Sequence, residues 1–199
     1  MRCCTEVSIL KGKIEYIDDC EEALVKSKLG LRYFSKEGSA RKALVEGFEK
    51  QQIYIAVDCN NNCLGFIWYI FDGIFHSFPY LHIIAVKEES RSHGIGKKLL
   101  KFFEDTCFKE CSKVFLVVAD FNPDAKRLYE KIGYTEVGAV PSLYREGITE
   151  HMMMKLREKK TNLIGQFPIK HDNKMSEPVL YENMKIYIYS FNDSASSIT

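Results

Sequence analysis

Two glycines stand one residue apart where an apolar run gives way to a basic segment, in the stretch RSHGIGKKLL. Gly94 and Gly96 lack a Cβ, so a ligand can approach the backbone closely there. The first turn of a helix exposes N–H groups and the positive end of the helix dipole, and both attract anions. Lys97 and Lys98 add local positive charge. We therefore expect a phosphate or pyrophosphate group to bind at this turn.

A second segment, NPDAKRLYEKIGY, predicts a short helix with polar groups on one face. Pro123 suits the first helical position after Asn122, and Gly133 suits the stop. Tyr129 follows Asn122 by seven residues, which places the two side chains on one face, two turns apart. Asn122 is a natural helix cap, a ligand contact, or both.

Two common phosphate motifs do not fit the glycine turn. A P-loop requires glycine at position 91 and Ser or Thr at position 98, and this sequence has Arg91 and Lys98. A Rossmann turn requires a third glycine where Leu99 stands, and it would follow the first strand rather than several.

The turn Arg91-Ser92-His93-Gly94-Ile95-Gly96 resembles the R/Q-x-x-G-x-G/A loop of the GNAT superfamily of N-acetyltransferases. The second segment is similar to that family's N-x-x-A-x-x-L-Y-x-K-x-G-F/Y signature. Its matching residues are Asn122, Ala125, Leu128, Tyr129, Lys131, Gly133 and Tyr134. The likeness runs from about residue 4 to residue 156, although before residue 53 only the order of elements agrees.

The resemblance implies an α/β (α+β) fold with a mixed, mostly antiparallel central sheet flanked by helices. The sheet would splay between its fourth and fifth strands, at residues 80–86 and 114–120. We expect a GNAT-like domain over residues 1–157 and a C-terminal extension over residues 158–199. The composition changes near residue 158, and residues 184–191 (MKIYIYSF) predict one strand that could pair along a sheet edge.

Local patterns add further elements. Asp18 or Asp19 suits the cap of one helix over residues 18–34, which has acidic residues in its first turn. Ser39 suits the cap of a helix over residues 39–51. Residues 53–71 predict two strands about a polar turn at residues 59–63.

The resemblance also implies which residues bind acetyl-CoA. Backbone groups of Ile84, Ala85 and Val86 would pair with the pantetheine arm, and amides from Ser92 to Lys97 would hold the pyrophosphate. The full set that it implies is Ile84, Ala85, Val86, Arg91, Ser92, His93, Gly94, Ile95, Gly96, Lys97 and Asn122. Tyr129 would protonate the departing thiolate. A phenol has a pKa of about 10, so it still carries its proton at neutral pH.

The proton acceptor is less defined. Strand alternation predicts that His82, Ile84 and Val86 share one face, and a histidine with an ordinary pKa of about 6.5 can accept a proton directly or through water. A hydrogen-bonded structural histidine is the alternative, and His76, Asp120 and Glu88 are rivals.

The implied function is acetyl transfer from acetyl-CoA to a primary amine of a small molecule, peptide or protein. The alternative is an acyl-CoA-binding regulatory domain without turnover. The aromatic segment FDGIFHSFPYLH would border the acceptor cleft. The formal net charge of +1 gives no reason to expect nucleic acid or an anionic membrane as partner, and a homodimer stays open.

Seven cysteines in a chain of 199 residues favour free thiols and a cytoplasmic location. The pairs Cys59/Cys63 and Cys107/Cys111 have a spacing that zinc sites use less often than a tighter one, so we expect buried hydrophobic cysteines and no metal. No apolar run approaches the roughly 20 residues of a membrane span.

Overall fold

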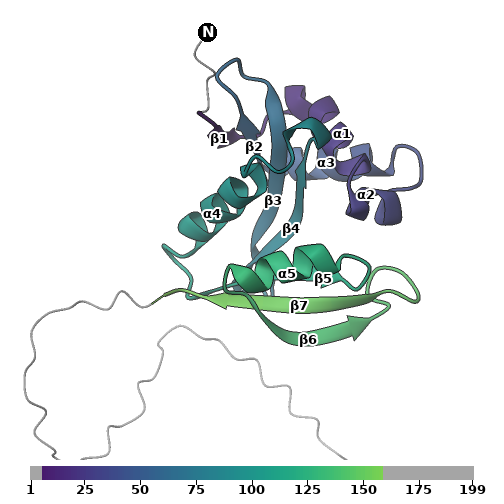
Figure 1. Ribbon diagram of the computed structural model, residues 1–199, viewed down its shortest axis with the longest axis vertical. Helices are drawn as coiled ribbons and strands as arrows, with labels where there is room; N and C mark the ends of the chain where they lie inside the picture. Colours follow the sequence, from purple (N-terminus) through teal and green to yellow (C-terminus); the bar gives the residue numbers. More distant parts are fainter. Residues whose placement is uncertain (1–5, 159–199) are drawn as a thin grey trace, which may run out of the picture. The chain divides into compact units, whose positions relative to one another are not determined.

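The computed structural model describes residues 6–158, which fold around one seven-stranded sheet of order β1-β2-β3-β4-β5-β7-β6 (Figure 1). Its strands are β1 (Ser8–Lys11), β2 (Ile53–Val57), β3 (Cys63–Ile74), β4 (Phe78–Val86), β5 (Lys113–Ala119), β6 (Thr135–Pro141) and β7 (Thr149–Leu156). The helices are η1 (Ile14–Tyr16), α1 (Ile17–Val25), α2 (Lys28–Tyr33), α3 (Ser39–Glu49), η2 (Glu88–Ser90), α4 (Ile95–Cys107) and α5 (Pro123–Lys131). The strand predicted at residues 184–191 lies outside the described residues.

The sheet is antiparallel except between β4 and β5, which run parallel because the helical crossover α4 joins them. This parallel ladder contains two residue pairs, Tyr80↔Phe115 and Leu81↔Leu116. Beyond Leu81 the two strands separate. The mixed sheet and its splay between the fourth and fifth strands are therefore confirmed.

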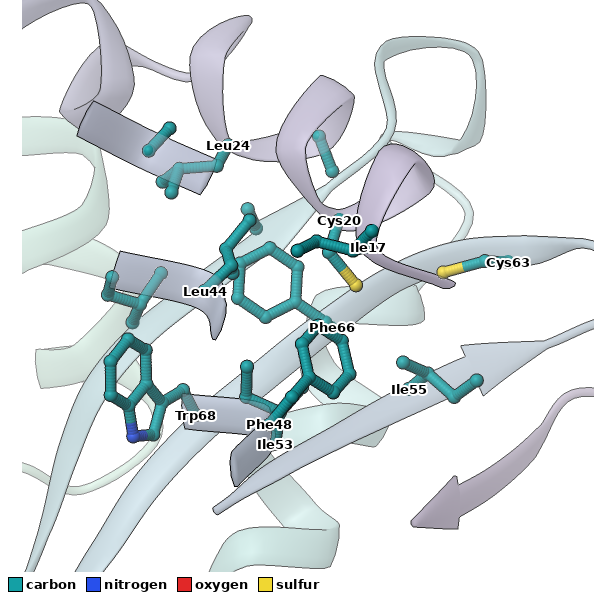
Figure 2. Close-up of a cluster of buried hydrophobic side chains, with 14 of the residues drawn as sticks. Ile17, Cys20, Leu24, Leu44, Phe48, Ile53, Ile55, Cys63, Phe66 and Trp68 are labelled. Atoms are coloured by element: carbon teal, nitrogen blue, oxygen red, sulfur yellow. The ribbon is translucent and has the colours of Figure 1, made fainter. Parts of the chain in front are cut away.

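Two apolar clusters pack on opposite faces of the sheet. The first lies against α1 and α3 and includes Leu24, Leu44 and Phe66 (Figure 2). The second lies under α4 and α5 and includes Leu99 and Phe103. Both helices α1 and α4 turn an apolar stripe toward the sheet, as amphipathic sequences of this period require.

The expectation of buried cysteines holds for Cys20, Cys63 and Cys107 but is wrong for Cys59, which is exposed, and Cys111 is half-buried. Cys20 and Cys63 belong to the first cluster, where Figure 2 shows their side chains among apolar neighbours, and Cys107 belongs to the second. Cys59 is exposed at the β2–β3 turn, which Asp58 holds by accepting a hydrogen bond from the amide of Asn62 at 2.9 Å. Within residues 6–158, no group of three His, Cys, Asp or Glu side chains is arranged to hold a metal ion.

The helical segment near the N-terminus differs from the prediction. The single helix expected over residues 18–34 is two helices, because Ser27 caps a new one: its Oγ accepts from the amide of Gly30 at 2.9 Å. Asp18 and Asp19 lie in the first turn of α1 rather than at its cap, and α3 is capped by Gly38, at φ 71°, rather than by Ser39. The break turns α2 away from α1.

Strand β4 carries an extra residue in its pairing with β3. Trp68 pairs with Ile83, and the next residue, Tyr69, pairs with Leu81. His82 therefore has no counterpart on β3 and forms a β-bulge, which changes the alternation of side chains along the strand.

The bulge makes the face prediction for β4 wrong. The ring of His82 meets Trp68 of the first cluster edge-on, with 4.6 Å between centroids. Ile84 and Val86 pack against the second cluster instead. His82 therefore does not share their face.

No helix within residues 6–158 is long and apolar enough to cross a membrane.

We predict that Gly30→Ala destabilises the fold. A Cβ at position 30 would lie 1.9 Å from the carbonyl oxygen of Leu24, so the α1–α2 turn has to shift. Overpacking against backbone should lower the free energy of unfolding by about 3 kcal/mol. That corresponds to a fall in Tm of about 6–12 °C for a domain of this size.

The matched control is Gly138→Ala in β6, where an added Cβ meets no atom of the described residues within 4 Å. Calorimetric scans giving both variants the same Tm would contradict this account of the turn.

Candidate active site

A cavity of about 470 Å³ opens where β4 and β5 separate. Its walls come from α2, β4, β5, α5, β7 and the connections between them. The lining residues are Ser27, Lys28, Leu29, Tyr33, Phe34, Arg91, Phe121, Asn122, Ala125, Tyr129, Tyr144, Glu150 and residues 80–84 and 116–119. A concave, mainly apolar site with a few polar groups is the usual form of a small-molecule site.

The glycine turn presents bare backbone at the start of α4. Gly94 is the N-cap residue of that helix at φ 80°, a left-handed conformation that glycine adopts without strain. A Cβ there would meet no described atom within 4 Å, and one at Gly96 would meet only Val86, at 3.8 Å. The turn thus leaves room for a ligand at exposed helix N–H groups.

The predicted loop residues divide by the position of their side chains. Those of Ser92, His93 and Lys97 are exposed, whereas that of Ile95, the first residue of α4, is buried in the second cluster. The side chain of Ala85 is buried in the cluster under α1 and α3. Ile95 and Ala85 can therefore offer a ligand only their backbone groups.

Arg91 uses its guanidinium within the protein. Its Nε donates to the carbonyl of Val86 at 3.2 Å, and a terminal nitrogen donates to the carbonyl of Lys26 at 2.9 Å. Arg91 therefore fastens the end of β4 to the turn before α2, and it also lines the cavity.

Asn122 and Tyr129 both line the cavity, as expected for two side chains on one face of α5. Asn122 precedes α5, yet its side chain makes no capping hydrogen bond to any described residue. Tyr129 is buried, and burial raises the pKa of its hydroxyl to about 12. The Tyr129 phenol is thus protonated throughout the physiological pH range and can donate.

His82 lies between two aromatic rings on the cavity wall. Its ring centroid is 4.6 Å from that of Trp68 and 5.9 Å from that of Tyr80. Burial lowers the pKa of His82 below its ordinary value, although the nearby Glu46 carboxylate works in the opposite direction. At neutral pH the imidazole is therefore uncharged, as a proton acceptor must be.

The predicted rivals of His82 lie elsewhere. His76, Glu88 and Asp120 do not line this cavity. The aromatic segment predicted to border it contributes Tyr80 and His82, whereas Phe75 at the hairpin tip is 73% exposed.

Sequence reasoning missed the carboxylate of the cavity. Glu150, on β7 between β5 and β6, is 2% exposed and accepts a hydrogen bond from the hydroxyl of Tyr33. Burial raises the pKa of Glu150, and this hydrogen bond works against the shift. The signal in the sequence was a glutamate in the apolar strand TEHMMMKL, where a charge needs a reason.

Comparison with known proteins gives the family. A profile of the acetyltransferase (GNAT) family matches residues 20–134, more than half of the chain. An uncharacterized N-acetyltransferase of Methanocaldococcus jannaschii is 39% identical over 88 residues, covering 42% of this chain and 54% of that protein. The S-(2-succino)cysteine N-acetyltransferase of Bacillus subtilis is 33% identical over 85 residues, covering 41% and 51%. The chain spans about half the length of these relatives.

The fold agrees with solved structures. The spermidine N-acetyltransferase of Vibrio cholerae, solved with CoA and spermine, superposes with a TM-score of 0.62 at 19% identity, covering 76% of this chain and 96% of that one. The chain belongs to the GNAT acetyltransferase family.

We predict that Asn122→Ala leaves stability nearly unchanged. Because the Asn122 amide caps nothing among the described residues, its loss should alter the free energy of unfolding by less than about 0.5 kcal/mol. The matched control is Ser27→Ala, which removes a real cap and should cost about 1 kcal/mol. Equal losses in urea titrations of the two variants would return Asn122 to a capping role.

Proposed function

We propose that the protein is an N-acetyltransferase that moves an acetyl group from acetyl-CoA to a primary amine. The observation that carries this proposal is the cavity at the parting of β4 and β5, which brings a buried proton donor, Tyr129, together with an uncharged imidazole and a carboxylate. The family membership and the N-acetyltransferase names of the relatives support it.

The chain fits acetyl-CoA at three points. Beyond Leu81 the edge of β4 no longer pairs with β5, so backbone groups of residues 84–86 can take the pantetheine amides as an added strand. Amides of residues 92–97 and the α4 dipole can take the pyrophosphate. The amide of Asn122 is available to the arm between them. Acetyl-CoA supplies an activated acetyl thioester.

The remaining chemistry falls to side chains in the cavity. The acceptor nitrogen must lose its charge before it can attack, and the departing thiolate must gain a proton. Tyr129 donates that proton, since its phenol stays protonated at neutral pH. His82 remains one predicted proton acceptor, because its lowered pKa keeps it neutral, and the Glu150 carboxylate in the same cavity is a second.

The regulatory alternative lacks an observation in its favour. A domain that only senses acyl-CoA needs neither a buried phenol nor proton acceptors in its cavity, and this cavity has both. Thiol release from acetyl-CoA over a panel of amines separates the two functions, because the alternative requires none.

We also propose that the protein works in the cytoplasm. Its core thiols Cys20, Cys63 and Cys107 are unbridged, as is usual in a reducing compartment. A homodimer and the role of residues 158–199 remain predictions, to be tested by mass measurement of the full chain and of a chain ending at residue 158.

Tyr129→Phe keeps the ring and removes the proton donor. We expect kcat to fall by about 100- to 10,000-fold, the contribution of a positioned acid. The affinity for acetyl-CoA, measured by calorimetry, should change little, because the hydroxyl acts on the sulfur as it departs. Turnover equal to that of the unaltered protein would leave Tyr129 as a packing residue.

Gly96→Val tests the pyrophosphate turn without straining it. The backbone at position 96 is not left-handed and a Cβ there is in ordinary contact with Val86, so the fold should tolerate the change. The side chain enters the phosphate path, and the Kd for CoA should rise by about 10- to 100-fold, as for one lost charge-assisted hydrogen bond.

Gly138→Val on β6 is the matched control, because position 138 also has room for a side chain. An unchanged Kd in folded Gly96→Val protein would overturn the pyrophosphate assignment.

A further inference from the structure

One wall of the cavity consists of tyrosines around a buried carboxylate. We name Tyr33, Tyr80, Tyr144 and Glu150 the tyrosine cage. The hydroxyl of Tyr33 donates to Oε1 of Glu150, and the hydroxyls of Tyr80 and Tyr144 lie 2.9 Å apart. The rings of Tyr33 and Tyr144 meet edge to face with centroids 6.0 Å apart. Residues from α2, β4, β7 and the β6–β7 connection thus line the same part of the cavity, and Tyr33 contacts the carboxylate directly.

The cage has an anion but no cation. Glu150 is 2% exposed, and its second oxygen, Oε2, accepts no hydrogen bond from residues 6–158. Burying a carboxylate is costly unless a cation or several donors offset it. Beyond the effect of burial, Asp120 nearby raises the pKa of Glu150 further, and His151 on the same strand works in the opposite direction.

The positive side chains of the cavity wall have other partners. Lys28 pairs with Asp124 at 2.8 Å, and Arg91 donates to two backbone carbonyls. Arg32 lies over the ring of Phe121 at 5.6 Å but does not line the cavity. Among residues 6–158, no lysine or arginine side chain pairs with Glu150, so a cationic ligand can take that place.

We propose that the tyrosine cage binds the acceptor as an ammonium ion, with Glu150 as its counter-ion and proton acceptor. The acceptor is a small primary amine on an apolar or aromatic carbon chain, and it has no carboxylate beside the nitrogen. This inference rests on the proposed acetyl transfer and names its substrate class. Faces of tyrosine rings attract cations, and a desolvated carboxylate strengthens that attraction.

The proton balance assigns a step to each group. The ammonium gives one proton to Glu150, and the neutral amine forms the N–C bond as the C–S bond breaks. The nitrogen then loses a second proton, while the thiolate takes one from Tyr129. The first proton passes from Glu150 to solvent, and the second restores Tyr129. The products are an N-acetyl amide, free CoA thiol and one proton.

Glu150 also explains which amines are excluded. An α-amino acid carries its carboxylate two bonds from the nitrogen, so the anion would enter the cage with the ammonium. An anion beside the buried Glu150 carboxylate is repelled strongly, and the described lysine and arginine of the cavity wall, Lys28 and Arg91, already have partners.

The test compares 2-phenylethylamine with L-phenylalanine and L-phenylalanine amide as acceptors for the full chain, by CoA thiol release. These differ in the group beside the amine: hydrogen, carboxylate and neutral amide. We expect kcat/KM for phenylalanine to lie about 100-fold or more below that for phenylethylamine. The amide should recover most of the loss. Equal kcat/KM for phenylalanine and phenylethylamine would overturn the proposal.

Glu150→Gln keeps the shape and removes the charge. The variant should lose most activity with phenylethylamine, and its preference over phenylalanine should shrink toward one. The control is Glu136→Gln on the neighbouring strand β6, whose carboxylate pairs with Lys126 and His151 outside the cavity lining. If Glu150→Gln slows all acceptors equally, the cage does not select by charge and the proposal fails.

Binding without turnover separates this inference from the acetyltransferase assignment. Calorimetry on the unaltered protein compares 2-phenylethylamine with 2-phenylethanol, which replaces the ammonium by a hydroxyl and needs no variant to fold. Tighter binding of the amine supports the cage even if no thiol is released, and that result would refute only the proposed activity. Equal or absent binding of both compounds overturns the cage.

Discussion

The limited pairing of β4 with β5 is the constraint on which the site depends. A parallel ladder of two residue pairs holds the two halves of the sheet together and then ends. Beyond its end, backbone N–H and C=O groups of β4 that a longer ladder would pair with β5 can bind a ligand instead. The cavity does not cut into the apolar core, because it lies where the hydrogen-bonded pairing of β4 and β5 ends. The apolar clusters on either face stay intact around it.

The conformation of α2 shows how local sequence rules shape that cavity. Ser27 accepts from the amide of Gly30 and donates to the carbonyl of Leu24 at 2.6 Å, so one hydroxyl ends α1 and starts α2. The new helix direction carries Tyr33 to the strand β7, more than a hundred residues later in the chain. A continuous helix over residues 18–34 would keep the direction of α1 and would place Tyr33 elsewhere.

Short-range patterns made the glycine turn and the family resemblance predictable, and that resemblance implied the mixed sheet with its splay. The role of Gly94 and Gly96 can be predicted from the sequence because backbone conformation and helix polarity are local properties. The spacing of Asn122 and Tyr129 likewise depends on one helix. The bulge at His82 could not be predicted from the sequence of β4, since it is defined by the pairing register between β4 and β3. The face of His82 was therefore assigned wrongly.

Glu150 was missed for a related reason. Its neighbours Tyr33, Tyr80 and Tyr144 come from three distant parts of the sequence, and only the folded chain brings them together. A glutamate in an apolar strand signals that something unusual is present. It does not say which side chains will surround it.

Arg91 connects the segment before the glycine turn with the segment before α2 through hydrogen bonds. Its guanidinium bridges the carbonyls of Val86 and Lys26, so the segment leading into the glycine turn and the segment leading into α2 share one clamp. Lys87 reinforces it through ion pairs with Asp19 and Glu22 of α1. A ligand that orders either segment lowers the entropic cost of ordering the other. Under the proposed function, acetyl-CoA and the acceptor amine should then assist each other's binding by the same factor, since such coupling is reciprocal.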